Sequence, residues 1–341
     1  MNKNTKTTLI VALSLFGAGV LIWLCVSLGI GFNFSKLTPG FRADADGTIS
    51  DSTSVKAERI EKNIEANGQN ISLNVGYADI RLEKSADADI HISYTNTEDS
   101  YFDLESNDSK IVLTQHQNGH FFFFSFFSSS GSGEVVVSIP DENIGNLDVD
   151  VASGEVSVSD IKLSGDFKLD TASGDVSLDN SKIGEFSANS ASGKIYLSDV
   201  DTDNIDINTA SGDISLSKIK GNIPVTLDTV SAEVYIEDVE TEDLSIGTVS
   251  GNITLKDVLG KTAGLSTTSG GVELNSADFL EIRFKTVSGD ISGAVVGSAE
   301  DYTVYTNTIS GSNSLSGHRE HGKRTLDLSS TSGSFEIRFE K

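Results

Sequence analysis

The chain has 341 residues, and 50 acidic against 25 basic side chains give it a formal net charge of −25. Residues 1–43 hold no Asp or Glu, so the acidic excess lies entirely in residues 44–341. Such a charge repels phosphate backbones and predicts no nucleic-acid partner. The single cysteine, Cys25, excludes a disulfide framework and a zinc site built from several thiolates.

An uncharged stretch follows Lys3 and Lys6, and its most apolar part runs from Leu9 to Ile30. As a helix this stretch spans about 33 Å, enough for a bilayer core of about 30 Å. We predict a transmembrane helix at residues 9–34, with residues 1–8 in the cytoplasm because basic residues stay inside. The protein is then a single-pass protein of the cell membrane with an extracytoplasmic C-terminal domain. A cleaved signal peptide is the alternative, although its apolar region is usually shorter.

The next two segments lack a fixed period. Residues 35–55 are polar and rich in Gly, Asp and Ser, which predicts a tether. Residues 56–145 contain strand-like runs such as Asp89–Tyr94 and Lys110–Thr114, which indicate an irregular β cap. Within this cap, Ile71–Leu82 has the pattern of a degenerate first coil of the repeat described below.

A run of phenylalanines inside the cap segment is a further candidate for function. If exposed, it would be an aggregation hazard, so we expect it either to plug the open end of the fold or to contact a partner or membrane. The six residues of this possible cap or contact are Phe121, Phe122, Phe123, Phe124, Phe126 and Phe127.

A Ser-Gly pair then recurs at intervals of 19 to 22 residues, and it organises residues 146–341. We take these pairs as structural anchors rather than catalytic residues. Nine of the ten copies keep both residues: Ser153, Gly154, Ser173, Gly174, Ser192, Gly193, Ser211, Gly212, Ser250, Gly251, Ser269, Gly270, Ser288, Gly289, Ser310, Gly311, Ser332 and Gly333. The remaining copy is Ser231-Ala232.

Apolar residues flank each anchor with a period of two. They stand four and six residues before the serine and three and five residues after it, as in Phe167 and Leu169 before Ser173. The phase of the alternation slips once, at the Ser-Gly pair, where glycine permits a bulged or left-handed backbone. Each repeat therefore predicts a strand, a corner, a second strand and a turn.

Such a short unit cannot bury its apolar face alone, but identical units stacked in parallel register can. The sequence predicts an all-β chain whose 19–22-residue coils form a parallel β-solenoid, with the right-handed crossover as the default. A β-sandwich is the alternative, although hairpin-linked strands would not need an in-phase repeat. A hydroxyl two residues before nearly every anchor serine should form a ladder that hydrogen-bonds from coil to coil.

Two groups of side chains could bind metal. Carboxylates recur just after the anchors at Glu155, Asp175, Asp213 and Asp290, and such a column could bind Ca²⁺. His318 and His321 flank Glu320 in a second candidate group, for which we favour a charged surface loop because no further ligand is near in the pattern. We therefore assign no metal, catalytic or cofactor-binding residue, and no cofactor.

The repeat with its preceding apolar segment resembles a known family. Units such as TASGDVSL (171–178) and TASGDISL (209–216) are similar to those of the LiaG-like family of bacterial, adhesin-like β-strand-repeat proteins. The resemblance covers residues 56–341 and departs at Ser231-Ala232 and in the two 22-residue spacings. It implies a membrane-anchored envelope protein without catalytic residues.

These observations predict an adhesin-like or scaffold protein that presents its solenoid to an envelope protein or a cell-wall polymer and is held in the cytoplasmic membrane by its helix. One alternative is an accessory component of a cell-envelope stress response. Another is a cell-wall polysaccharide enzyme on a β-helix, which would need a local cluster of catalytic side chains that interrupts the columns.

Overall fold

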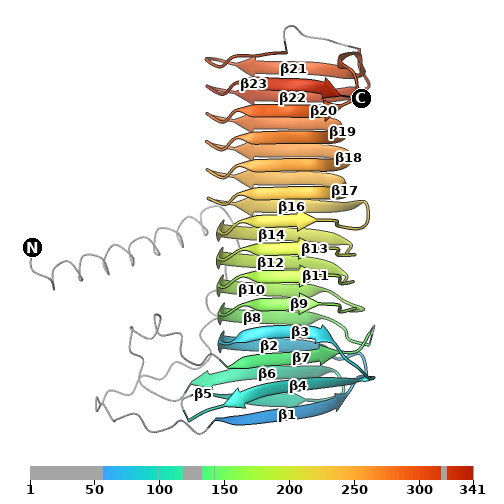
Figure 1. The fold of residues 1–341 in the computed structure, drawn as a ribbon, viewed down its shortest axis with the longest axis vertical. Helices are drawn as coiled ribbons and strands as arrows, with labels where there is room; N and C mark the ends of the chain where they lie inside the picture. The colour runs from blue at the N-terminus through green and yellow to red at the C-terminus, as the bar shows by residue number, and fades with distance from the viewer. Residues whose placement is uncertain (1–56, 99, 118–132, 142, 316–320, 341) are drawn as a thin grey trace, which may run out of the picture. The chain divides into compact units, whose positions relative to one another are not determined.

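The computed structural model describes residues 57–98, 100–117, 133–141, 143–315 and 321–340 (Figure 1). The chain divides into two compact units, Met1–Thr38 and Pro39–Lys341, and all the described residues belong to the second. The predicted membrane helix at 9–34 and the phenylalanine run lie outside the described residues. Within the described ranges, no helix is long and apolar enough to cross a membrane.

The second unit is a parallel β-solenoid, which confirms that part of the predicted fold class (Figure 1). We call the strands before the Ser-Gly pairs side 1 and the strands after them side 2. Side 1 includes β8 (Leu147–Ser153), β10 (Phe167–Ser173), β12 (Glu185–Ser192), β14 (Asn204–Ser211) and β16 (Ile223–Thr229). Side 2 includes β9 (Val156–Ser159), β11 (Val176–Asp179), β13 (Ile195–Ser198) and β15 (Ile214–Ser217). The handedness of the coil stays a prediction.

Three long strands continue the stack, and each runs from side 2 of one coil to side 1 of the next. They are β17 (Val234–Thr248), β18 (Ile253–Thr267) and β19 (Val272–Thr286), followed by β20 (Ile291–Val296). In the earlier coils a short third side joins side 2 to the following side 1, and isolated parallel bridges such as Lys162 to Lys182 connect its levels.

The in-register stacking places like residues above one another and fills the core. Along side 1, Leu147 pairs with Phe167, and Phe167 pairs with Phe186. These three side chains are at most 1% exposed. Because side chains alternate across a strand, the intervening residues face outward in columns of their own.

A second corner, between side 2 and the third side, also uses left-handed backbone. One residue per coil has a positive φ there, and most are Asp or Asn, which tolerate this conformation better than other L residues. The seven residues are Asp160, Asn180, Asp199, Lys218, Asp238, Asp257 and Ser276.

At the N-terminal end, the coils do not stack in chain order. The strands there are β1 (Glu58–Glu65), β2 (Asn70–Tyr77), β3 (Asp79–Lys84), β4 (Asp89–Asn96), β5 (Ser100–Ser106), β6 (Lys110–Gln117) and β7 (Glu134–Ile139). The coil formed by β2 and β3 lies between the β8–β9 coil and the β6–β7 coil. Antiparallel strands cover the outer coil, since β5 pairs with β6 and β4 pairs with β7.

The C-terminal end repeats this arrangement in mirror order. It contains η2 (Ala299–Asp301), β21 (Tyr302–Thr308), β22 (Arg324–Ser330) and β23 (Phe335–Glu340). β22 pairs with β19 on one edge and with β21 on the other, while β23 pairs with β20. The tenth repeat is therefore inserted between the eighth and the ninth.

Candidate binding surface of the solenoid

The Ser-Gly anchors line one corner of the coil, where consecutive glycines touch through their backbones. A β-carbon on Gly174 would meet the carbonyl oxygen of Gly154, and the same holds for Gly193 above Gly174. At the C-terminal end the order of these contacts is Gly289, Gly333, Gly311, as the inserted coil requires. The anchors that the sequence singled out thus lie together, and their role in the described structure is close backbone packing.

The acidic column after the anchors is part of the same backbone packing. The Asp175 carboxylate accepts the backbone N–H of Lys194 at 2.8 Å, and that of Asp213 accepts the N–H of Glu233 at 3.2 Å. Asn252 does the same for Gly271 at 2.9 Å, and Asp290 does so for Ser334 at 2.7 Å. These oxygens therefore satisfy the next coil's backbone, which leaves them less available to a cation.

The hydroxyl column two residues before the anchors does not form the expected coil-to-coil ladder. In the upper coils, those from Thr248 toward the C-terminus, each hydroxyl accepts the N–H of its own anchor glycine, as Thr267 does from Gly270 at 2.8 Å. In the lower coils, those before Thr248, four hydroxyls are buried without a hydrogen-bond partner among the described residues: Thr171, Ser190, Thr209 and Thr229. The expectation was wrong because stacked hydroxyls lie about 4.8 Å apart, beyond hydrogen-bond distance.

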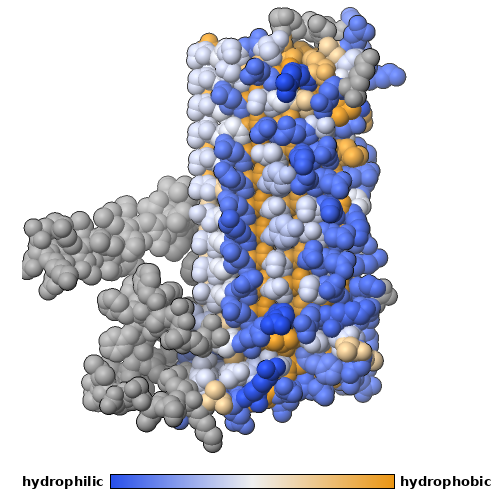
Figure 2. Space-filling view, viewed as in Figure 1, coloured by the Kyte–Doolittle hydropathy of each residue, from blue (hydrophilic) through white to orange (hydrophobic). Residues whose placement is uncertain are grey.

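The outward positions of side 1 hold an acidic surface that the sequence analysis missed. Five carboxylates near the anchors on its lower coils form what we call the side-1 acidic surface: Asp148, Asp150, Asp170, Asp206 and Asp228. They stand three or five residues before an anchor serine, so the repeat alignment could have revealed them. Figure 2 shows how hydrophilic residues run in columns along the stacked coils, beside a pale column at one edge.

The charges on this surface act on one another. Lys168 donates to Asp170 at 2.9 Å, and this bond together with the charges of Asp170, Asp150 and Asp148 raises the pKa of the lysine. Partial burial and the Asp206 charge raise the pKa of the Asp228 carboxyl. The surface thus concentrates negative charge that one lysine only partly offsets.

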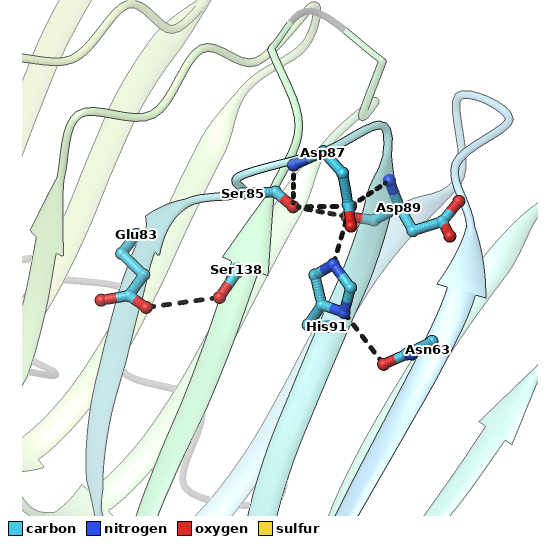
Figure 3. A network of polar contacts seen from close by, with 7 residues as sticks. All are labelled: Asn63, Glu83, Ser85, Asp87, Asp89, His91 and Ser138. Atoms are coloured by element: carbon cyan, nitrogen blue, oxygen red, sulfur yellow. Dashed lines mark hydrogen bonds and ion pairs between the residues drawn. The ribbon is translucent and has the colours of Figure 1, made fainter.

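A Ser, an Asp and a His also meet near the N-terminal end (Figure 3). Asp87 Oδ1 lies 2.7 Å from His91 Nε2, while the Ser85 hydroxyl donates to the Asp89 carbonyl at 2.8 Å. The backbone N–H of Asp89 and then the bond to His91 lower the pKa of Asp87. The other His91 ring nitrogen is engaged by Asn63 at 2.9 Å, so the histidine is not free to activate the serine. The network closes the turn between β3 and β4.

The remaining candidate residues contribute no site within the described ranges. His318 and Glu320 lie outside them, whereas His321 is exposed at the start of the last described range. Among the described residues, no group of three or more His, Cys, Asp or Glu side chains could hold a metal ion. The six phenylalanines at 121–127 lie in a segment that the structure does not describe.

Comparison with known proteins gives a family. A family model described as Toastrack DUF4097 matches residues 68–227 and again 224–341. A search of the curated proteins found no match. One solved structure, described as "a putative cell adhesion protein" from Clostridium sporogenes, is 11% identical with a TM-score of 0.22, and the match covers 84% of this chain and 100% of that one. Another, "a putative adhesin" from Parabacteroides merdae, is 12% identical with a TM-score of 0.26, covering 84% and 97%.

Proposed function

The chain belongs to the Toastrack DUF4097 family, and we propose that it is an adhesin-like scaffold that binds a cationic envelope partner on its side-1 acidic surface. The observation that carries the proposal is that two outward columns of one continuous parallel sheet carry carboxylates, Asp148 and Asp206 in one column and Asp228 in the other. A sheet surface whose carboxylates are spread over several stacked coils suits an extended partner better than a small molecule.

The chemistry of this surface defines the partner as basic. The carboxylates after the anchors bind backbone N–H groups, whereas Asp148 and Asp228 accept no hydrogen bond given by the described residues. Basic side chains of an envelope protein or amino groups of a wall polymer would pair with such carboxylates. Association driven by surface charge is fast and weakens as salt increases.

A binding role fits the described residues better than catalysis. The Ser85, Asp87 and His91 side chains meet in an order unsuited to nucleophilic attack, because Asp87 lies between the other two. Within the described ranges, the outward columns continue without a cluster of catalytic carboxylates that interrupts them. We therefore favour the scaffold over the polysaccharide enzyme.

The proposed location follows from the sequence of the first unit. Residues 9–34 would anchor the chain in the cytoplasmic membrane, with residues 1–8 inside and the solenoid outside. In that location the acidic surface faces the cell envelope, where it would meet basic proteins and amino-bearing polymers.

Binding to poly-L-lysine tests the proposal on the full-length chain in detergent micelles. The triple variant Asp148→Asn, Asp206→Asn and Asp228→Asn should weaken binding about tenfold at low salt, corresponding to about 1.4 kcal/mol. The matched control Asp179→Asn, Glu273→Gln and Glu336→Gln removes the same charge from side 2. Equal weakening in both variants, or no binding by the unmodified chain, would contradict the proposal.

A further inference from the structure

The inserted C-terminal coil fills a slot between two other coils. On side 1, Leu326 pairs with Ile282 below it and with Val304 above it. On side 2, Phe335 pairs with Ile291. Leu326, Ile282 and Phe335 are at most 1% exposed, so the inserted coil is an integral part of the core.

Polar contacts hold the coil in this slot. Arg324 Nη1, at the start of β22, donates to Asp278 Oδ1 at 2.6 Å and to the Val296 carbonyl at 3.0 Å. The guanidinium also lies over the Tyr302 ring, 5.7 Å from its centroid. One side chain thereby joins β22 to β19, β20 and β21. At the other end of the coil, Ser276 donates to Glu340 at 2.6 Å.

The repeat also supplies a second occupant for the same position. Val304 and Thr306 of β21 stand in the register positions of Leu326 and Leu328. β21 could therefore stack directly on β19 and cover Ile282 and Phe284 if the inserted coil left. Because the slot can close in this way, departure of the coil need not expose the full apolar face, which lowers the cost of exchange.

From these relationships we infer that the C-terminal coil, residues 324–340, exchanges between two copies of the chain. In the exchanged pair, β22 and β23 of each copy occupy the slot between β19–β20 and β21 of the other. The contacts of β22 and β23 with β19, β20 and β21 are then reproduced between copies. Exchange of an identical element is a low-cost route to a dimer, because no new interface has to be built.

The partner is therefore a second copy of this chain, held by its last repeat. This inference uses neither the side-1 acidic surface nor a basic ligand, so it can fail or succeed independently of the proposed function. It gives the C-terminal end of the solenoid a role in self-association.

Disulfide trapping between two differently tagged full-length chains tests the exchange, with Cys25→Ser in both. One chain carries Lys285→Cys and the other Ser329→Cys, because these residues are paired across β19 and β22. A disulfide between the two tags forms only if one chain's C-terminal coil lies in the other's slot. We expect this product to increase with protein concentration.

A matched control pair reports random collision. Ser187→Cys on one chain and Asp206→Cys on the other are paired between β12 and β14, far from the exchanged coil. Arg324→Ala should make the exchanged product form several-fold faster, because the contacts that hold the coil in its slot are weakened, while Arg324→Lys, which keeps the charge, should speed it less. A single chain that carries both Ser187→Cys and Asp206→Cys, made with each Arg324 variant, should form this disulfide within the chain and so show that the variant is still folded. A yield of the disulfide between the two tagged chains no higher than that of the control pair, both with Arg324 intact and with Arg324 replaced, would overturn the inference.

Discussion

The carbonyl oxygen of Gly193 lies directly where a β-carbon on Gly212 would stand. This contact joins two neighbouring coils through backbone atoms, and it recurs from anchor to anchor along the corner. Because backbone atoms cannot rotate aside as a side chain can, the spacing of the stack depends on glycine here.

Gly212→Ala should therefore destabilise the solenoid by about 3 kcal/mol, since the methyl group would force two coils apart. Gly264→Ala is the matched control, because the nearest atom to its added β-carbon is the Leu244 carbonyl oxygen at 3.9 Å. That change should be neutral or stabilise by about 0.5 kcal/mol, as alanine orders the strand better than glycine. Urea unfolding of the two variants measures the difference, and equal effects would contradict close packing at the anchor.

Removing the hydroxyl two residues before an anchor should stabilise the fold in the lower coils and destabilise it in the upper coils. Thr209→Val replaces a buried hydroxyl that has no hydrogen-bond partner in the structure, so it should stabilise the fold by about 1 kcal/mol. Thr267→Val removes the acceptor of the Gly270 N–H and should destabilise by about 1 kcal/mol. The free energies of unfolding of both variants check this, and a shared sign would show that the two corners do not differ.

The carboxylate column after the anchors should be sensitive to the loss of its oxygen and not to the loss of its charge. Asp175→Ala leaves the Lys194 N–H without its acceptor and should cost about 1 kcal/mol. Asp175→Asn keeps an acceptor, as Asn252 does naturally in a later coil, and should stay close to the unmodified chain. Thermal unfolding with and without millimolar Ca²⁺ separates this role from cation binding. If the column bound Ca²⁺, the ion would stabilise the unmodified chain, and Asp175→Asn would lose that stabilisation.

The elevated pKa of Asp228 predicts a pH-dependent cost of folding. Burial and then the Asp206 charge raise this pKa, so the folded chain binds the proton more readily than the unfolded chain. Asp228→Asn should therefore increase stability at pH 7, and its advantage should shrink as the pH falls through the folded-state pKa. Unfolding free energies between pH 7 and pH 4 measure this trend, with Asp179→Asn as the control for overall charge. A stability advantage of Asp228→Asn that does not change with pH would contradict the raised pKa of Asp228.

The coil was predictable from sequence because each repeat contains the residue pattern that specifies its strands and its corner. Apolar residues with a period of two specify the buried faces, and the phase slip at glycine specifies the corner, as Phe167, Leu169 and Gly174 illustrate. Seven residues with positive φ at the second corner were less predictable, since Lys218 and Ser276 replace the more usual Asp or Asn.

The corner changes along the stack, and the residue before the anchor serine changes with it. Alanine precedes the serine in the lower coils, where Ala210 is 2% exposed. Larger residues follow from Val230 onward, and Val287 is 52% exposed and Ile309 is 79% exposed. The corner therefore has two forms, because the residue before the serine is buried or half-buried up to Val230 and exposed from Val249 onward. The one replaced anchor glycine, Ala232, lies where the two forms meet.

The order of the terminal coils could not be read from the repeats. Leu326 and Val304 occupy equivalent positions, so either strand satisfies the apolar surface of β19. Only long-range contacts distinguish them, chiefly those of Arg324 with Asp278 and the Val296 carbonyl. The side-1 acidic surface was missed for a related reason, because outward positions do not affect the repeat pattern that defines the fold.

The stacking order itself is tested most directly by two cysteine pairs within one full-length chain that carries Cys25→Ser. Lys285 pairs with Ser329, and Ser329 pairs with Asn307. Adjacent coils lie about 4.8 Å apart, within disulfide range, whereas coils two levels apart exceed the limit of about 7 Å. The inserted coil predicts rapid oxidation of Lys285→Cys with Ser329→Cys and none of Lys285→Cys with Asn307→Cys. Rapid oxidation of the second pair, which would place β21 directly on β19, would contradict it.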